Sequence, residues 1–300
     1  MSRRVVQIGG RRLALANLEK PLYPASGFTK AECLEYYLRI ADCILPHLRD
    51  RAVTLKRYPD GVEAGFFFEK RCPPHPAWVQ TAELALDEGE RMTACLVNDP
   101  ATLIWVANLA ALELHVPLAR AGSPQTADAM VFDLDPGEPA DVLACARVAL
   151  ILRDLLSRMG VESFVTTSGR KGLHVYVPLN APGTTFEATK GFSRAVAVTL
   201  EKNYPELVTA RMAKEQRAGR VFINWSQNDA KKTMICVYSL RAGEEPMVAF
   251  PLSWGELETL AGEGKPARFR ISHAEALERA EKTGDLFQEV LVMKQKLPHI

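Results

Sequence analysis

Two features of a membrane or secreted protein are missing from this 300-residue chain. No apolar run approaches the roughly 18 to 20 residues that are needed to cross a bilayer. The N-terminal segment, MSRRVVQIGGRRLALANLEK, lacks the long apolar stretch and the small-residue cleavage site of a secretory signal. We therefore expect a cytoplasmic protein with no membrane partner.

Paired cysteines are also missing. The six cysteines are scattered, without a CxxC pair and without a histidine at the spacing of a zinc site. Cys43, Cys145 and Cys236 lie inside apolar runs, where a thiol behaves as a small hydrophobic side chain. This pattern predicts that all six are reduced and that the protein holds no structural zinc.

The chain has no excess of charge of one sign, because its formal net charge is +1. Binding to a polyanion must therefore depend on local patches. Lysine and arginine do cluster, at Arg3–Arg4, Arg11–Arg12, Lys56–Arg57, Arg170–Lys171, Lys214–Arg220 and Lys231–Lys232. On charge alone, an ordinary solvated surface is the favoured explanation of these clusters.

Hydrophobic periodicity and capping signals predict a mixture of helices and strands. Thr29–Glu32 is typical of a capping box that opens a helix running to about Ile44, and DPATLIWVANLAALELHVPL predicts a helix that ends near His115. Further helices are predicted at ADVLACARVALILRDLLSRMG, closed by Gly160, and at 184–203. Strands are predicted at VTLKRYPDG, GFFFEK, AMVFDLD, FVTTS, LHVYVPL, RVFINW and TMICVYSL. This order indicates an α+β fold with mixed or antiparallel sheets flanked by helices.

The predicted strand AMVFDLD carries two carboxylates, Asp133 and Asp135. Because side chains alternate along a strand, both point to one face, while Phe132 and Leu134 point into the core. Adjacent carboxylates repel each other unless a cation binds them, and oxygen ligands suit Mg²⁺ or Mn²⁺. Two such ions can activate an attacking hydroxyl and stabilise a leaving pyrophosphate. A solvated turn at the end of a strand explains a lone DxD equally well.

The segment TSGRKGLH joins the next two predicted strands through the turn Gly169–Gly172. Glycines let the backbone approach a ligand closely, and successive N–H groups can form an anion nest. Ser168 adds a hydroxyl, Arg170 and Lys171 add positive charge, and alternation places His174 away from the apolar row. The segment is not a P-loop, because neither a helix nor a GK[ST] ending follows. The alternative is a polar hairpin turn with a basic tip.

A third segment, RVFINWSQNDAKKTMICVYSLRA, places Asn224 on a predicted strand. Lys231, Lys232 and Arg241 follow it and are suited to contacts with phosphates. Taken by itself, this segment is better explained as a β-hairpin whose SQNDAKK loop is merely polar.

Several motifs in this order resemble the polymerase domain of bacterial ligase D: FDLDP, TSGRKGLHVYVPL, NWSQND with VYSLRA, LEKPLYPASGFTK, LKRYPDG and NLAALELH. That domain belongs to the archaeo-eukaryotic primase superfamily and works in non-homologous end joining. The resemblance runs from about Leu18 to Trp254 and implies one primase-polymerase domain over 1–300. Its expected parts are an N-terminal part with DNA-end contacts (1–125), a catalytic part (126–260) and a C-terminal helical extension (261–300).

The resemblance implies two sets of residues around the nucleotide. Metal-binding catalytic positions would be Asp133, Asp135 and Asn224. The nucleotide-binding set would comprise Lys56, His115, Ser168, Lys171, His174, Lys232 and Arg241. Within it, Lys56, Lys232 and Arg241 would neutralise triphosphate charge, while His115 would contact the sugar and phosphates.

The resemblance also implies DNA contacts. Lys20 and Lys30 are similar to a pair that grips the 5′-phosphate on the downstream side of a gap. Phe67 and Phe68 are similar to an aromatic pair that stacks on template bases at the break. Read without the resemblance, FFF is an ordinary apolar strand.

One position departs from the family pattern, because the family usually carries a third aspartate where this chain has Asn224. An amide oxygen can coordinate a metal, but it brings no charge and cannot act as a base. A natural variant of reduced activity, an engineered inactivation, or compensation by another acid such as Asp229 would each explain the difference.

The resemblance implies a template-dependent nucleotidyltransferase that fills gaps and extends DNA ends with NTPs or dNTPs, ribonucleotides preferred, at a two-metal Mn²⁺ or Mg²⁺ site. Its implied partners are primer–template DNA with a 5′-phosphate, Ku, and a DNA ligase supplied in trans or by a fused domain, on the nucleoid of a prokaryote. The alternative is a DNA-end-binding and bridging module whose catalysis is weakened or lost because of Asn224. A primer-independent primase is disfavoured by the missing zinc-binding element, and a DxD nuclease would not need the SGRKG hairpin.

Overall fold

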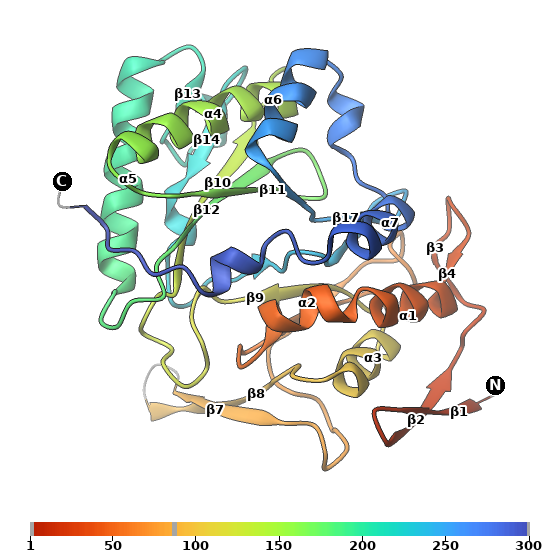
Figure 1. The fold of residues 1–300 in the computed structure, drawn as a ribbon. Coiled ribbons are helices and arrows are strands. Elements are labelled where there is room, and N and C mark those ends of the chain that lie inside the picture. Colours follow the sequence, from red (N-terminus) through yellow and green to blue (C-terminus); the bar gives the residue numbers. More distant parts are fainter. Residues whose placement is uncertain (1–2, 86–88, 299–300) are drawn as a thin grey trace.

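The protein is described by a computed structural model that covers residues 3–85 and 89–298. Two main sheets form its upper and lower halves in Figure 1. The upper sheet has six strands, in the order β13 (Val208–Thr209), β14 (Val221–Asn224), β10 (Ala129–Pro136), β12 (Leu173–Pro178), β11 (Phe164–Thr167) and β18 (Pro251–Leu252). Its central strand β10 pairs antiparallel with both neighbours, β12 and β14.

The lower sheet has four strands, in the order β15 (Met234–Ile235), β9 (Ala111–Val116), β5 (Thr54–Arg57) and β6 (Phe67–Glu69). All of its pairings are antiparallel. The remaining strands form two-stranded ladders: β1 (Arg3–Ile8) with β2 (Arg11–Ala16), β3 (Pro21–Tyr23) with β4 (Phe28–Thr29), β7 (Thr81–Ala85) with β8 (Arg91–Cys95), and β16 (Leu240–Arg241) with β17 (Met247–Val248).

Helices cover each half. The upper sheet packs against α4 (Val142–Arg158) and α5 (Phe186–Asn203), with α6 (Trp254–Glu263) against α4. The lower half contains α1 (Lys30–Arg39), α2 (Ala41–Leu48) and α3 (Pro100–Asn108), and α7 (His273–Thr283) contacts α1. No helix in the described part of the chain is long and apolar enough to cross a membrane.

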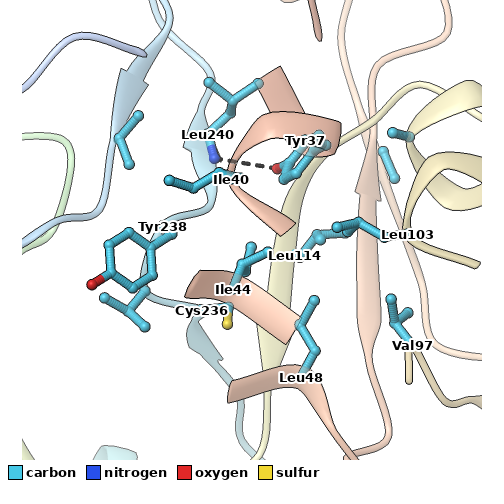
Figure 2. Close-up of a cluster of buried hydrophobic side chains, with 14 of the residues drawn as sticks. Tyr37, Ile40, Ile44, Leu48, Val97, Leu103, Leu114, Cys236, Tyr238 and Leu240 are labelled. Carbon is cyan, nitrogen blue, oxygen red and sulfur yellow. Dashed lines mark hydrogen bonds between the residues drawn. The ribbon is translucent and has the colours of Figure 1, made fainter. Parts of the chain in front are cut away.

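The core of the lower half follows from helical periodicity. Tyr37, Ile40, Ile44 and Leu48 recur every three or four residues, so they lie on one side of α1 and α2, and all four are fully buried. They meet side chains of α3, β9 and the segment 236–240 (Figure 2). Each such aliphatic side chain contributes about 1.5–3 kcal/mol by leaving water.

The C-terminal segment connects the two halves. After α7 the chain runs between them (Figure 1), through the 3₁₀ turn η5 (Gln288–Leu291), which contacts both α2 and β12. The side-chain amide of Asn180, just after β12, donates to the carbonyls of Val290 and Met293 at 2.9 and 2.8 Å. The segment therefore stabilises the relative placement of the two sheets.

The structure confirms the α+β class, the capping box and the hairpin, and it shifts several boundaries. Thr29 and Glu32 form the reciprocal capping bonds, but the helix is interrupted at Ile40 and ends at Leu48 instead of near Ile44. Buried residues lie on both sides of Pro46, at Leu45 and Leu48, and their packing stabilises the last turn of α2 as a helix despite the proline. The next predicted cap, at 184, is one residue early, because Thr185 accepts the bond from the N–H of Ala188.

The prediction of one helix ending near His115 is wrong. Helix α3 ends at Asn108, Ala110 adopts a positive φ of 60° that turns the chain, and Ala111–Val116 forms β9. The strand does alternate apolar and polar residues, at Leu112, Glu113, Leu114 and His115, but it directly follows the apolar run of α3, so the sequence pattern predicts one helix across both segments.

The segment TMICVYSL is not one strand. It is divided into β15 and β16, with Tyr238 at a positive φ of 66° between them. The hairpin expected between RVFINW and this segment does not form, because β14 belongs to the upper sheet and β15 to the lower one.

The prediction of six reduced cysteines is wrong at one pair. Cys72 and Cys95 form a disulfide with a Cα–Cα distance of 4.8 Å, joining the segment after β6 to the end of β8. The two residues meet only because β8 packs beside that segment, which sequence spacing does not reveal. Cys43, Cys145 and Cys236 are free and buried, as expected from their apolar surroundings in the sequence, and Cys33 is free and buried as well.

Candidate active site

Strand β10 carries the acidic pair on one face, at the centre of the upper sheet. Asp133 and Asp135 lie two residues apart, while Phe132 and Leu134 between them are fully buried on the opposite face. The pair lies just before Pro136, which ends the strand. The predicted alternation is therefore confirmed.

Neighbouring strands bring two more predicted residues to Asp133. His174 on β12 and Asn224 on β14 stand directly opposite it in register. The Nε2 atom of His174 lies 3.6 Å from Oδ1 of Asp133, and Nδ2 of Asn224 donates to Oδ2 at 3.1 Å. Burial lowers the pKa of His174 to about 3, so its ring is neutral at physiological pH.

The two aspartates are held in an environment that disfavours two negative charges. Burial raises the pKa of Asp133, against the hydrogen bonds that Gln227 and Asn224 donate to it. Burial and the adjacent charge of Asp133 raise the pKa of Asp135 to about 6. A cation would relieve both effects, so this donor set is suited to a divalent metal. Among the described residues, no three acidic, histidine or cysteine side chains are arranged as a complete set of metal ligands.

A chain of hydrogen bonds runs from Lys232 to the acidic pair. The Nζ atom of Lys232 donates to Oγ of Ser226 at 2.8 Å, and that hydroxyl donates to Oδ1 of Asn224 at 2.7 Å. Asp229, considered above as a compensating acid, instead forms a 2.6 Å ion pair with Lys190 of α5.

The hairpin between β11 and β12 is built around Ser168. Its hydroxyl oxygen accepts from the backbone N–H groups of Arg170 and Gly172 at 3.2 and 3.1 Å. A Cβ atom on Gly172 would lie 2.3 Å from the carbonyl oxygen of Leu134, so only glycine lets the turn lie against β10. Lys171 is exposed at the tip, and its positive charge favours the ionised form of Asp135.

A cavity of about 700 Å³ opens beside this hairpin. Its lining includes Arg170, Lys171, Arg241 and Arg270, as well as Pro136, which follows the acidic pair. Its volume lies within the range of small-molecule sites. Acidic residues line the cavity as well, namely Glu138, Asp141, Glu244 and Glu245, so the lining carries charges of both signs.

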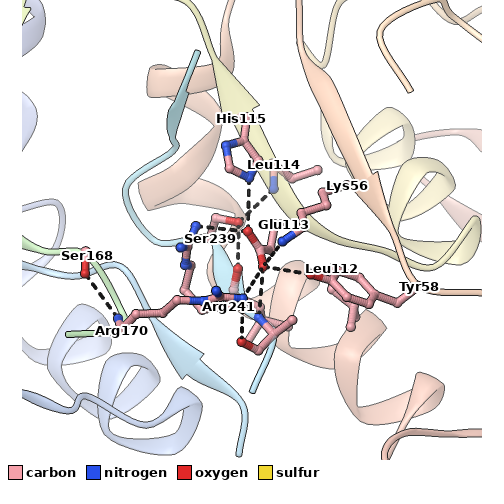
Figure 3. A network of polar contacts seen from close by, with 12 residues as sticks. Lys56, Tyr58, Leu112, Glu113, Leu114, His115, Ser168, Arg170, Ser239 and Arg241 are labelled. Carbon is pink, nitrogen blue, oxygen red and sulfur yellow. Dashed lines mark hydrogen bonds and ion pairs between the residues drawn. The ribbon is translucent and has the colours of Figure 1, made fainter. Parts of the chain in front are cut away.

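The lower sheet contributes a residue that the sequence did not single out, Glu113 on β9. Its side chain is fully buried among Lys56, His115 and Arg241, three residues that were predicted to bind nucleotide (Figure 3). Burial alone would raise the pKa of Glu113, but the hydrogen bond from His115 and the charge of Arg241 hold it well below its usual value. The prediction of a helix at this segment concealed the face that Glu113 shares with His115.

The four predicted DNA-end residues divide between two places. Lys20 forms a 2.6 Å ion pair with Asp60, and the buried Nζ of Lys30 donates to the carbonyl oxygen of Ala16 at 2.8 Å. The backbone N–H of Lys30 donates to the carbonyl of Lys20 at 2.8 Å, so the two lysines are neighbours. Burial lowers the pKa of Lys30.

Phe67 and Phe68 are both exposed on β6, but they point to opposite faces of the sheet. Phe68 pairs in register with Lys56, and its ring centroid lies 5.8 Å from that of His115. Phe67 pairs with Arg57, whose guanidinium lies 5.1 Å from its ring centroid. Phe68 therefore lies on the face that carries Lys56 and His115, and Phe67 lies on the other face of the sheet.

A DxD on the central strand of a mixed sheet, beside a basic hairpin and a second sheet, defines a core of the primase-polymerase class. Within this class, the family described as LigD, primase-polymerase domain matches residues 29–287, and the chain belongs to that family.

Curated relatives carry most of this chain as one part of a longer protein. The multifunctional non-homologous end joining DNA repair protein LigD of Mycobacterium tuberculosis is 42% identical over 289 residues, which cover 93% of this chain and 37% of the relative. The bifunctional non-homologous end joining protein LigD of Bacillus subtilis is 34% identical over 274 residues, 91% of this chain and 43% of the relative. This chain therefore spans well under half of the length of these relatives.

A solved structure supports the same assignment. The polymerase domain from Mycobacterium tuberculosis ligase D in complex with DNA superposes with a TM-score of 0.87 at 40% identity, covering 95% of this chain and 99% of that one.

Proposed function

We propose that this chain is a template-directed nucleotidyltransferase that fills gaps and extends DNA ends in non-homologous end joining. The observation that carries the proposal is the pair Asp133 and Asp135 on one face of β10, beside the hairpin whose Lys171 charge favours the ionised form of Asp135. The cavity beside this hairpin is lined by both acidic and basic residues. Mixed charge of this kind suits a metal-bound triphosphate and not a neutral metabolite.

Asp133, Asp135 and the amide oxygen of Asn224 are the groups that would hold divalent metal, Mn²⁺ or Mg²⁺. The raised pKa values of the two acids fit this role, because burial and the repulsion of Asp133 disfavour two negative charges that a bound cation would stabilise. When bound, the metal would supply Lewis-acid stabilisation of the reacting phosphate and lower the pKa of the attacking hydroxyl.

The chain's own residues would orient the nucleotide. Lys56, Lys171, Lys232 and Arg241 would neutralise the triphosphate, and Ser168 would present its hydroxyl to a phosphate oxygen. The 3′-hydroxyl of the primer would release its proton to water, and its oxygen would form a bond to the α-phosphorus as the bond from that phosphorus to the α,β-bridging oxygen breaks. Pyrophosphate would be the leaving group.

The preferred substrate and the partners are part of the same proposal. Ribonucleotides would be preferred over deoxyribonucleotides, with His115 and His174 beside the nucleotide. Lys20, Lys30, Phe67 and Phe68 would contact DNA ends that carry a 5′-phosphate. Because the relatives are longer proteins, a DNA ligase would act in the same polypeptide or in trans, together with Ku.

Asn224 favours a second candidate, a DNA-end-binding and bridging module with weakened or lost catalysis. Its amide Nδ2 donates a hydrogen bond to Asp133 and its oxygen accepts one from Ser226, and neither atom supplies the negative charge of a third carboxylate. End contacts would persist, because Lys20, Lys30 and Phe67 lie outside this network.

The test is primer extension on a gapped duplex with a downstream 5′-phosphate, Mn²⁺ and ribonucleotides, comparing the chain with Asn224→Asp. Template-matched extension by the unmodified chain supports the polymerase. Extension by Asn224→Asp alone supports the bridging candidate, an inactivated polymerase that binds ends. If neither protein extends the primer although both bind DNA tightly, the catalytic proposal is overturned.

A further inference from the structure

One carboxylate, that of Glu113, accepts hydrogen bonds from several separate segments at the centre of the site (Figure 3). Its Oε1 atom accepts from Nζ of Lys56 at 3.2 Å and from the hydroxyl of Tyr58 at 3.0 Å. The backbone N–H of Ala242 donates to the same oxygen at 3.2 Å. Full burial removes water from this oxygen, so each donor depends on it.

The second oxygen binds two more groups. Oε2 accepts from Nε2 of His115 at 3.0 Å and from the Arg241 guanidinium at 2.9 Å. Because an ionised carboxylate only accepts, His115 must carry its proton on Nε2, which leaves Nδ1 for another partner. Arg170 of the hairpin lies 3.5 Å from Oε1, so the carboxylate also faces the half that carries the acidic pair.

The charges around Glu113 do not balance. Three cations, Lys56, Arg170 and Arg241, surround one carboxylate, and 3 − 1 leaves a net charge of +2. The side chains of Lys56 and Arg241 are only 8% and 14% exposed. The buried Nε of Arg241 has no hydrogen-bond partner in the described structure. An anion is the ligand that would satisfy these groups.

We propose that Glu113 is a positioning residue that holds Lys56, His115 and Arg241 together as a preassembled receptor for the triphosphate of the incoming nucleotide. This inference rests on the proposed function and adds a residue that does not itself touch the substrate. Its value lies in preorganisation, because the donors are oriented before the anion arrives.

Glu113→Gln has two opposing effects on the affinity for anions, so the direction of the change distinguishes a pure charge effect from a positioning role. Net charge alone predicts stronger anion binding, because a negative charge is lost. Positioning predicts weaker binding, because Arg241 and Lys56 lose the charge that orients them in a buried place. Burial already lowers the pKa of Lys56, so the loss of Glu113 also favours its neutral amine.

Asp285 offers a matched control. It is also a buried carboxylate that pairs with a histidine, a tyrosine and a backbone N–H, those of His47, Tyr238 and Phe287, at 2.9 Å each. These partners lie in the packing between α2 and the C-terminal segment. Asp285→Asn therefore reproduces the loss of a buried charge without touching the receptor.

The experiment measures the binding of inorganic tripolyphosphate, and of ATP with Mn²⁺, to the full chain by titration calorimetry. We expect Glu113→Gln to raise both dissociation constants at least about tenfold, whereas Asp285→Asn leaves them unchanged. In extension assays on the Asn224→Asp background, the nucleotide KM should rise more than kcat falls. Thermal unfolding of each variant shows that it is folded.

Equal or tighter tripolyphosphate binding by a folded Glu113→Gln variant would overturn the inference and leave the proposed function standing. A second outcome is that Glu113→Gln weakens tripolyphosphate binding, while neither the chain with Asn224 nor the Asn224→Asp variant extends a primer. This result would support the receptor and reject the polymerase. Absence of binding by the unmodified chain would overturn both. If Asp285→Asn weakened binding as much as Glu113→Gln, the effect would be one of stability, and the inference would fail.

Discussion

At the scale of single residues, the chemistry of the site depends on which atom each side chain presents. Asn224 and an aspartate have nearly the same shape, but the amide donates a hydrogen bond to Asp133, whereas a carboxylate would add a third negative charge. In the same way, Glu113 stabilises its neighbours through two oxygens that accept from both sides. The difference between binding and turnover is therefore decided by a few atoms.

Asn224→Asp is expected to lower the Mn²⁺ concentration for half-maximal primer extension and to raise the extension rate at least about tenfold. The added carboxylate supplies charge and oxygen ligands next to Asp133. A manganese titration of the extension rate measures the effect. Asp229→Asn serves as control and should leave the rate unchanged, because Asp229 is paired with Lys190. A large loss in the control would show instead that Asp229 compensates for Asn224.

At the scale of elements, the turn between β11 and β12 is positioned by a close contact between backbones. Gly172 lies against the carbonyl of Leu134 on β10, and Gly169, at a positive φ of 68°, lies against the backbone N–H of Ala249. These contacts hold Ser168 and Lys171 beside the acidic pair. Without them, the hairpin would have to move away from β10.

Gly172→Ala is expected to destabilise the protein by about 1–3 kcal/mol and to reduce extension, because the new Cβ would overlap backbone atoms. Gly191→Ala is the matched control, since Gly191 is exposed inside α5 with open space around it. That variant should gain about 0.5–1 kcal/mol from helix propensity. Denaturant unfolding of both variants gives the two free energies, and a neutral Gly172→Ala would contradict the proposed contact.

The disulfide between Cys72 and Cys95 acts on the segment between β6 and β8. Its reduction is expected to lower the free energy of unfolding by about 3 kcal/mol, because the unfolded chain regains the entropy of an open loop. Thermal unfolding with and without dithiothreitol measures the change. Cys72→Ser should unfold at the temperature of the reduced protein and be insensitive to the reductant. An unmodified protein that is equally insensitive would show that the bond does not form.

At the scale of the whole molecule, two sheets meet at the site, and the C-terminal segment connects them. Asp285 accepts bonds from His47 of α2 and from Tyr238 between β15 and β16. Burial alone would raise the pKa of Asp285, but the bond from His47 holds it below its usual value. The ionised carboxylate therefore contributes to the free energy of unfolding.

This contribution has a defined dependence on pH. Because the pKa of Asp285 is lower in the folded protein, the unfolded chain takes up the proton at a higher pH. The contribution of Asp285 to the free energy of unfolding is therefore full above the unfolded pKa of about 3.9, and it is lost as the pH falls through the folded pKa. Asp285→Asn should lower the free energy of unfolding by about 2 kcal/mol at neutral pH and flatten its decline below about pH 4. Denaturant unfolding across pH 2–7 measures both. If the free energy of unfolding of Asp285→Asn declined below about pH 4 as steeply as that of the unmodified protein, other groups would be responsible for the decline.

Local signals were sufficient where turn residues bound an element. Asp133, Asp135 and His174 were placed correctly because their strands alternate and end at Pro136 and at the Gly169–Gly172 turn, and Thr29 was placed by its capping box. The same reasoning failed for 111–116, because no glycine or proline separates this strand from the apolar run of α3, and Glu113 was missed as a result. Cys72 and Cys95 were missed because they meet through β8 and not through spacing.

The amino-acid sequence by itself determined the acidic strand, the basic hairpin, the α+β class and the family, because these depend on neighbours within a few residues or on motifs in order. Only the tertiary structure decided that Glu113 joins Lys56, His115 and Arg241, that Asn224 bonds to Asp133, and that Phe67 and Phe68 face opposite ways. The physical reason is that these relations depend on strand register and on the packing of two sheets. Both are set by the burial of the whole chain.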